Sequence, residues 1–307
     1  MAQPQFSLQD FDYFVVIDWS SRSKPSPKKK SKDAIWVSEG KAAGRMFTRY
    51  FRTRHEGILH IRATLLRLVR QKRRVLVGWD FAFGYPKGFA KALRLKKKQG
   101  WKSIWQLLDD LVVDDRDNGN NRFTVGGDLN RRITHGSGPF WGVPAGRSGV
   151  FLGARKDFEF PVKNKRVSLA ELRLVERRNK TMHSVWKLMY PGSVGSQSLV
   201  GIPRLCQLTR DKKLNEHSLV WPFDTDFTES LPVDKRPLIL HAEIYPSFQK
   251  LPGKDKIVDR EQVRAYFQWL QREQAMGDLV KHLAGPTDLS KKERKAVLEH
   301  EGWVLGV

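Results

Sequence analysis

Three acidic residues stand at or near the ends of short apolar segments that have the composition of buried strands. Asp18 lies near the end of DYFVVIDW, Asp80 near the end of VLVGWDF, and Glu243 near the end of LILHAEIYP. A carboxylate at the end of a buried strand is costly unless it has a partner, such as a metal ion, a basic side chain or a capped amide. Carboxylate oxygens are hard ligands that suit Mg²⁺ or Mn²⁺, so we expect these three acids to bind one or two such ions. Taken singly, each acid also fits a hydrogen-bonded strand end or a helix cap.

A fourth acidic residue is needed to complete many sites of this kind. Asp259, at the start of a predicted helix, is our fourth catalytic candidate. Asp278 within that helix, Glu301 before the last Gly-Trp pair and Glu56 at an earlier helix are alternatives that the sequence does not rank.

The elements that must position these acids follow from the hydrophobic pattern. The segments DYFVVIDW, DAIWVSE and RMFTRYFR read as three successive strands, and apolar residues at helical spacing predict a helix over 55–72. The segment at 75–81 is then a fourth strand, which a crossover helix allows to lie parallel to the first. Because ligands of such sheets sit at the carboxyl ends of parallel strands, Asp18 and Asp80 are expected to lie within reach of one ion.

The remaining chain divides into a long insertion and a return to the core. We expect residues 1–86 to be the first part of the core, 87–236 an insertion of helices and irregular loops, and 237–307 the second part of the core. The insertion contains an Asn/Gly-rich stretch near residue 120 and a Gly-rich stretch near residue 195, both interpreted as loops or turns. Apolar spacing predicts helical packing over 259–284, broken near Gly277, before a short capped helix begins after Ser290.

The charge of the chain favours anionic partners. Lys and Arg number 56 against 33 Asp and Glu, giving a formal net charge of +23 and a field that attracts polyanions. One basic cluster lies in a Pro/Ser-containing segment that we interpret as a mobile loop. It consists of Lys24, Lys28, Lys29, Lys30 and Lys32. A nucleic acid is therefore the expected partner, with DNA and RNA left open.

Further residues in the insertion could contact phosphate. Guanidinium groups clamp phosphate bidentately, and the Gly-rich stretch could expose backbone amides to an anion. The expected substrate-binding residues are Arg122, Arg131, Arg132, Arg177, Lys187 and Gln197. For each cation the alternative is an ordinary surface charge.

Four short motifs resemble landmarks of a known family. IDWS, GWDFAFGYP, AEIYP and EGWVLG occur in this order and resemble those of an uncharacterised prokaryotic family with a ribonuclease H-like fold. The resemblance implies that Asp18, Asp80 and Glu243 are the acidic positions of the family. With the element order, it predicts an α/β protein with a ribonuclease H-like, mixed five-stranded sheet flanked by helices, and with the long insertion between the fourth and fifth strands.

These expectations lead to one main function and two alternatives. The main hypothesis is a hydrolase of phosphodiester bonds in nucleic acid that depends on Mg²⁺ or Mn²⁺. The alternatives are a non-catalytic nucleic-acid-binding protein, and a phosphohydrolase or phosphotransferase acting on a nucleotide or another small phosphate compound. A single cysteine, Cys206, and the lack of a signal-like or 18-residue apolar segment predict a cytoplasmic protein with no membrane partner.

Overall fold

The computed structural model describes residues 10–95, 100–164, 167–227, 236–249, 251 and 257–307. The chain groups into two compact units. Unit 1 consists of Met1–Asp80, Leu208–Thr287 and Val304–Val307, and unit 2 of Phe81–Gln207 and Asp288–Trp303. The segments 1–86, 87–236 and 237–307 stay a prediction of the domain borders.

Unit 1 contains a six-stranded mixed sheet in the order β3-β2-β1-β4-β8-β7. The strands are β1 (Tyr13–Asp18), β2 (Ile35–Lys41), β3 (Met46–Phe51), β4 (Arg74–Trp79), β7 (Ser218–Val220) and β8 (Leu238–Glu243). Strands β1, β2 and β3 form an antiparallel meander, whereas β1, β4, β8 and β7 run parallel to their neighbours. The predicted α/β class, mixed sheet and parallel pairing of the first and fourth strands are confirmed. The sheet has six strands rather than the expected five, because the three-residue edge strand β7 is too short to give a periodic signal.

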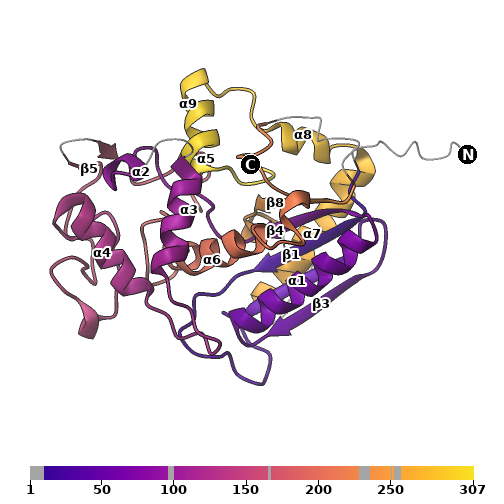
Figure 1. Ribbon diagram of the computed structural model, residues 1–307, viewed down its shortest axis with the longest axis horizontal. Helices are drawn as coiled ribbons and strands as arrows, with labels where there is room; N and C mark the ends of the chain where they lie inside the picture. The colour runs from indigo at the N-terminus through magenta and orange to yellow at the C-terminus, as the bar shows by residue number, and fades with distance from the viewer. Residues whose placement is uncertain (1–9, 96–99, 165–166, 228–235, 250, 252–256) are drawn as a thin grey trace, which may run out of the picture. The chain divides into compact units, whose positions relative to one another are not determined.

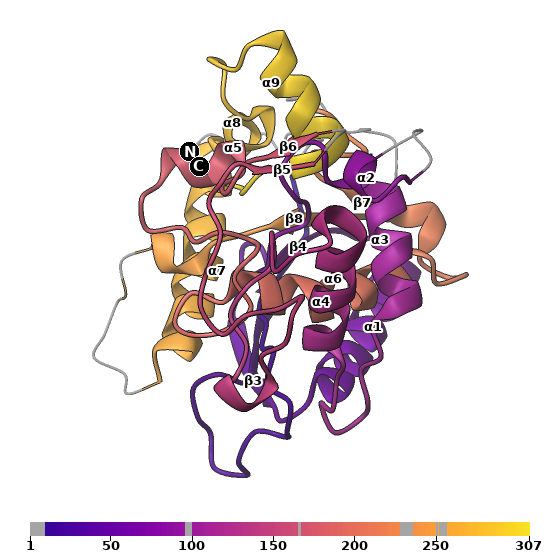
Figure 2. The same ribbon diagram turned by 90° about the vertical axis from the view of Figure 1, so that its left-hand side faces the viewer.

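Two long helices cover the sheet of unit 1 on opposite faces, as Figures 1 and 2 show. Helix α1 (Arg54–Arg70) begins with a capping box between Thr53 and Glu56, and it is the crossover between β3 and β4. Helix α7 (Val258–Met276) ends at Gly277, whose φ of 77° is the left-handed conformation that glycine adopts at a helix end. The short helix α8 (Leu279–Ala284) follows it. The predicted crossover helix and the break near Gly277 are confirmed.

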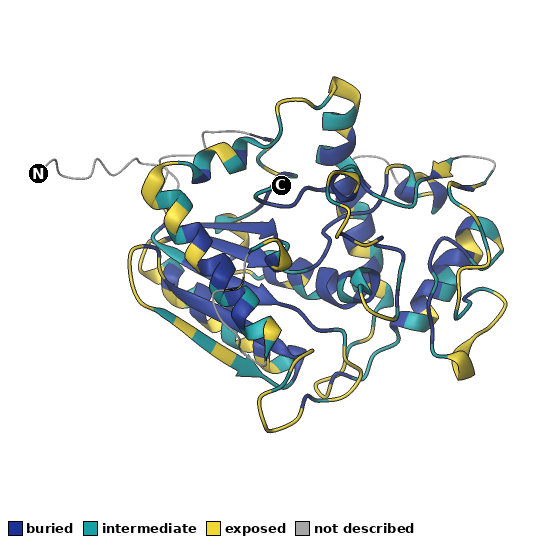
Figure 3. Cartoon of the chain, turned by 180° about the vertical axis from the view of Figure 1, so that it is seen from behind, coloured by how far each residue is buried: buried dark blue, intermediate teal, exposed yellow. Residues whose placement is uncertain are grey.

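The core of unit 1 is formed by the three parallel strands in the middle of the sheet. Nearly all residues of β1 and every residue of β4 and β8 are buried, which explains their continuous apolar composition. The edge strand β3 instead alternates between intermediate and exposed residues (Figure 3). The 3₁₀ turns of this unit are η2 (Asn215–His217) and η3 (Pro246–Phe248).

Unit 2 is mostly helical. Its helices are α2 (Phe89–Ala92), α3 (Gly100–Leu111), α4 (Arg122–Thr134), α5 (Leu174–Arg178), α6 (Val194–Thr209, whose last two residues belong to unit 1) and α9 (Lys291–Ala296). A two-stranded sheet of β5 (Val162–Lys163) and β6 (Ser168–Leu169), the 3₁₀ turn η1 (Ala145–Arg147) and the π-helical turn η4 (Val297–Glu301) complete it. The expected capping box between Ser290 and Glu293 at the start of α9 is confirmed.

Two helices of unit 2 occupy stretches that the sequence predicted to be irregular. In α4 the buried residues Val125, Leu129 and Ile133 recur every four positions, a helical stripe that the surrounding Asn and Gly residues obscure. In α6 the glycines serve close packing: a Cβ on Gly201 would lie 2.7 Å from the ring of Phe81. The loop interpretation was therefore wrong for 122–134 and 194–209, whereas 112–121, 135–144 and 189–193 are loops and turns as predicted.

No helix in the described part of the chain is both long enough and apolar enough to cross a lipid bilayer.

Candidate active site

The register of the parallel strands brings three of the predicted acids to one edge of the sheet in unit 1. Ile17 of β1 pairs with Trp79 of β4, and Trp79 pairs with Glu243 of β8. Asp18 and Asp80 each lie one residue further along their strands, and the Asp80 amide donates to the Ile17 carbonyl at 3.0 Å. This edge is the carboxyl end of the parallel strands, where the topology of α/β sheets gathers functional side chains.

Asp18 and Asp80 share a hydrogen bond between their carboxyl groups. Asp18 is only 7% exposed, and its pKa is raised well above the ordinary value by burial, then by the charges of Asp80 and Asp259. Burial also raises the pKa of Asp80 to about 7, although the hydrogen bond from Asp18 lowers it in part. Two carboxylates this close are held together by a proton, or by a cation that takes its place.

The other two predicted acids act on this pair electrostatically. The charges of Asp259 and Glu243 both raise the pKa of Asp80. Glu243 is 3% exposed, and its carbonyl accepts from the Leu305 amide at 2.9 Å. Asp259 lies in the first turn of α7, where the helix dipole favours negative charge, and burial raises its pKa. The four catalytic candidates thus lie close enough for their charges to interact.

Two residues of this region were missed by the sequence interpretation. The Asp33 amide donates to the Asp259 carboxylate at 2.6 Å, and the charge of Asp33 raises the pKa of Asp18. Tyr266 of α7 is buried, its hydroxyl donates to the Leu305 carbonyl at 2.7 Å, and its pKa is raised well above the ordinary value by burial and by the charge of Asp80. Tyr266 follows Asp259 by seven residues, so the helical period of α7 was a signal for it. Asp33 stands before β2 with no such pattern.

The donor set fits a magnesium-like ion in part. Among the described residues, no group of three or more His, Cys, Asp or Glu side chains is arranged to hold a metal. Mg²⁺, however, is commonly bound through one or two carboxylates together with water and substrate phosphate oxygens. The hydrogen-bonded carboxyls of Asp18 and Asp80 provide that smaller set, with Glu243 and Asp259 nearby.

The three alternative fourth ligands serve other roles. Glu56 accepts the amides of Arg52 and Thr53 as part of the cap of α1. Asp278 is half-buried just before α8 and pairs with Lys281 at 2.6 Å. Their hydrogen bonds explain both acids as local structure.

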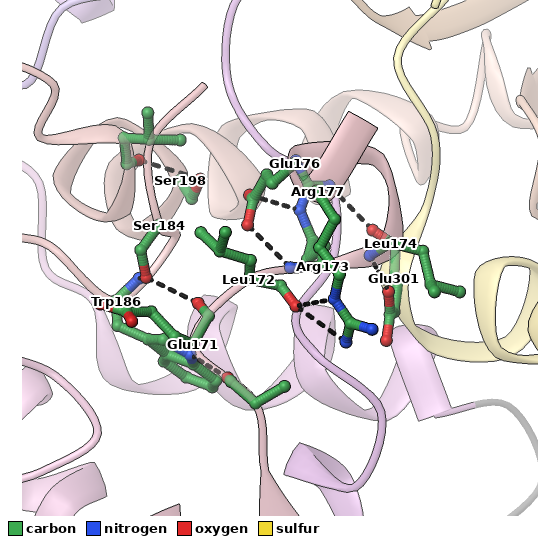
Figure 4. Close-up of polar contacts among 12 residues, drawn as sticks. Glu171, Leu172, Arg173, Leu174, Glu176, Arg177, Ser184, Trp186, Ser198 and Glu301 are labelled. Atoms are coloured by element: carbon green, nitrogen blue, oxygen red, sulfur yellow. Dashed lines mark hydrogen bonds and ion pairs between the residues drawn. The ribbon is translucent and has the colours of Figure 1, made fainter. Parts of the chain in front are cut away.

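Glu301, the third alternative, belongs to unit 2 and caps a helix there. Its carboxylate accepts the amides of Leu174 at 2.7 Å and Lys87 at 2.9 Å. The neighbouring Arg173 is 2% exposed, donates to the Glu301 carbonyl at 2.8 Å, and forms an ion pair with Glu176 at 2.8 Å (Figure 4). This buried network fixes the start of α5.

The predicted substrate-binding residues all belong to unit 2, where most have protein partners. Arg122 is buried and donates to Ser196 at 2.9 Å and to Asn120 at 2.7 Å. The partners of Arg131, Arg177 and Lys187 are the Asp128 carboxylate and the carbonyls of Leu172 and Pro191, respectively. Arg132 is exposed and Gln197 half-buried. The buried contacts of Arg122 are those of a structural residue, and the phosphate-binding role of all six stays a prediction.

No protein-family model, curated protein or solved structure matches this chain. The function must therefore be inferred from the chemistry of the strand-end acids.

Proposed function

We propose that this protein is a divalent-metal-dependent hydrolase of phosphodiester bonds in nucleic acid, with Asp18 and Asp80 as the metal ligands. The observation that carries the proposal is the pair itself: the buried carboxyl group of Asp18 and the half-buried one of Asp80, at adjacent parallel strand ends and joined by a hydrogen bond. Among the described residues, the charged groups with a resolved effect on the pKa of Asp80 are acids, namely Asp18, Asp259 and Glu243. A bound cation would relieve the repulsion between these carboxylates. Without a cation or a proton, holding several negative charges this close together is costly.

The order of elements in unit 1 supports a ribonuclease H-like core. Three antiparallel strands are followed by the crossover helix α1 and by β4, which is parallel to β1. This order and the acids at the ends of β1 and β4 are features of the proposed fold class. A shared fold does not fix the reaction, so the acids and not the topology carry the argument.

Each acid has a proposed role in the reaction. When bound, Mg²⁺ or Mn²⁺ would supply a Lewis acid that activates water and neutralises charge on the phosphate. Asp18 and Asp80 would hold the ion in place of the proton that they share. Glu243 and Asp259, whose charges already raise the pKa of Asp80, would add negative charge near the ion and would orient water at the edge of the site.

The lysine-rich segment that follows β1 supports a polyanionic substrate. The lysines are exposed, whereas the backbone is anchored: Arg54 donates to the carbonyls of Ser20 and Arg22 at 3.0 and 2.8 Å, and Tyr50 to that of Pro27 at 2.7 Å. The segment is a loop, as predicted, and its mobility stays a prediction. Lys32 of this segment lowers the pKa of Asp259, so positive charge reaches the acids. Exposed lysines in a segment whose charge reaches the acids suit a phosphate backbone.

The test is a cleavage assay on the full chain with labelled single-stranded DNA, duplex DNA, RNA and an RNA:DNA hybrid. We expect cleavage of at least one polymer in Mn²⁺ or Mg²⁺, none in EDTA, and none by Asp18→Asn or Asp80→Asn. Asp110→Asn, an exposed aspartate on α3, is the matched control and should cleave like the unchanged protein.

Two results would replace the proposal. Release of phosphate from nucleotides without polymer cleavage would identify an enzyme for small phosphate compounds. Salt-sensitive binding of DNA or RNA that survives Asp18→Asn and Asp80→Asn, without cleavage in either metal, would identify a binding protein.

A further inference from the structure

Unit 1 contains a second feature, at the opposite edge of its sheet from the acids. A cavity of about 390 Å³ is bounded by the start of β1, the end of β2, the last turn of α1 and the residues just before β4 and β8. It is separated from Asp18 by the length of β1, about 17 Å at the usual rise of a strand. None of the acids of the candidate active site lines it.

The cavity is cationic. Four basic side chains and two carboxylates line it, which leaves a formal excess of two positive charges. The basic residues are Lys41, Arg67, Arg73 and Arg236, and the acids are Asp10 and Asp12.

A single carboxylate serves two of the guanidinium groups. The Asp12 carboxylate lies 3.4 Å from the guanidinium of Arg73 and 3.2 Å from that of Arg236. Its shortest contact is with the backbone amide of Arg74, which donates to it at 2.7 Å. Arg73 and Arg236 are 47% and 42% exposed, so each guanidinium has donors that face solvent as well as Asp12. The buried guanidinium of Arg74 adds a further positive charge, and its pKa is lowered by burial and then by Arg236. An anion would relieve this crowding of positive charge.

The walls of the cavity combine this charge with flat and apolar surface. The guanidinium of Arg67 lies over the ring of Tyr13, 5.6 Å from its centroid, and Leu68 and Ala42 contribute apolar surface. The volume falls within the range of small-molecule sites, which is about 300 to 1,000 Å³. The site is therefore large enough for an organic anion and not only for an inorganic ion.

We propose that this cavity binds a small phosphomonoester, with the phosphate between Arg73 and Arg236 and the organic part against Tyr13 and Arg67. Guanidinium pairs favour phosphate because their parallel donors match its oxygens. The proposal is independent of the proposed hydrolase activity, because no residue is shared between the two sites.

The experiment is calorimetric titration of the full chain in EDTA with four probes: inorganic phosphate, ribose 5-phosphate, AMP and adenosine. We expect ribose 5-phosphate or AMP to bind more tightly than inorganic phosphate, and adenosine to bind more weakly than AMP. The double variant Arg73→Gln/Arg236→Gln should weaken binding by at least about 100-fold, since each lost guanidinium costs about tenfold. A matched double variant with the same change in charge, Arg116→Gln/Arg155→Gln, removes two exposed arginines of unit 2 and should bind as the unchanged protein does.

A second variant separates the cavity from general electrostatics and from misfolding. Ala43→Trp places a large ring at the exposed rim of the cavity without changing any charge, and it should also abolish binding. Absence of binding by every probe at millimolar concentration would overturn the proposal. So would affinities of ribose 5-phosphate and AMP that both fail to exceed that of inorganic phosphate, an equal loss in the two double variants, or undiminished binding by Ala43→Trp.

Discussion

The burial of carboxylates is compensated in different ways at two places in unit 1, around Glu39 and around Asp18. Glu39 in β2 is 4% exposed, and burial alone would raise its pKa. Its carboxylate instead accepts from His60 at 2.8 Å, Arg49 at 2.9 Å and Thr64 at 3.2 Å, and these contacts lower the pKa. Asp18 is buried to a similar extent, but the charges with the largest effect on it are those of other acids.

The difference teaches which carboxylate is structural and which is available for a cation. Glu39 has protein donors that stabilise its charge, so the fold itself compensates its burial. Asp18 and Asp80 compensate each other only by sharing a proton, which leaves the pair ready to exchange that proton for a metal ion.

The largest expected difference is in catalysis. Asp80→Asn should reduce metal-dependent cleavage by about 1,000-fold, because a ligand set that supplies several kcal/mol of transition-state stabilisation is lost. Glu39→Gln should stay within about twofold of the unchanged protein. Rates are measured at 20 °C with folded protein, as verified by circular dichroism. Equal rates for the two variants would remove the functional distinction between the sites.

The second difference is in stability without metal. Because the pKa of Asp80 is raised to about 7, the folded state holds a proton that the unfolded state releases above about pH 4. The free energy of unfolding therefore falls as the pH rises from about 4 to about 7, by as much as about 4 kcal/mol at 1.36 kcal/mol per pKa unit. Asp80→Asn avoids this loss and should be more stable than the unchanged protein at pH 8 in EDTA, with no such advantage at pH 4. Urea unfolding at both pH values measures it, and a variant that is less stable at pH 8 would contradict the argument.

Glu39 should show the opposite sign. Its lowered pKa means that the ionised carboxylate contributes stability above pH 4.5, and that this contribution is lost as the pH falls through the folded-state pKa. Glu39→Gln should cost about 2 kcal/mol at pH 7, a moderate value because Arg49 is half-exposed and can be rehydrated. The exposed Glu159→Gln is the control and should change little. A cost for Glu39→Gln that persists undiminished at pH 2 would show that packing and not charge holds this site.

The sequence predicted the part of this comparison that depends on short-range pattern. The apolar segments ending near Asp18, Asp80 and Glu243 became neighbouring parallel strands, since continuous apolar runs and a crossover helix leave few alternative topologies. Helix α4 was missed because Asn and Gly residues masked its apolar stripe, although the Asn130 amide donates to three loop carbonyls and orders the surrounding chain. The contact of Asp33 with Asp259 spans 226 residues, and no local pattern reports such a distance.

The last and smallest effect is the release of protons on metal binding. If Mn²⁺ replaces the proton shared by Asp18 and Asp80, binding must release protons, and their number must fall as the pH rises past the pKa of Asp80. We expect more protons to be released at pH 6 than at pH 8.5, with a difference of about one proton. Titration calorimetry in two buffers of different ionisation enthalpy measures this number. The Glu39→Gln variant should give the same proton counts as the unchanged protein, because the Glu39 carboxylate is already ionised and paired at both pH values and releases no proton when the metal binds. A proton count that does not change between pH 6 and pH 8.5 would mean that the metal binds elsewhere.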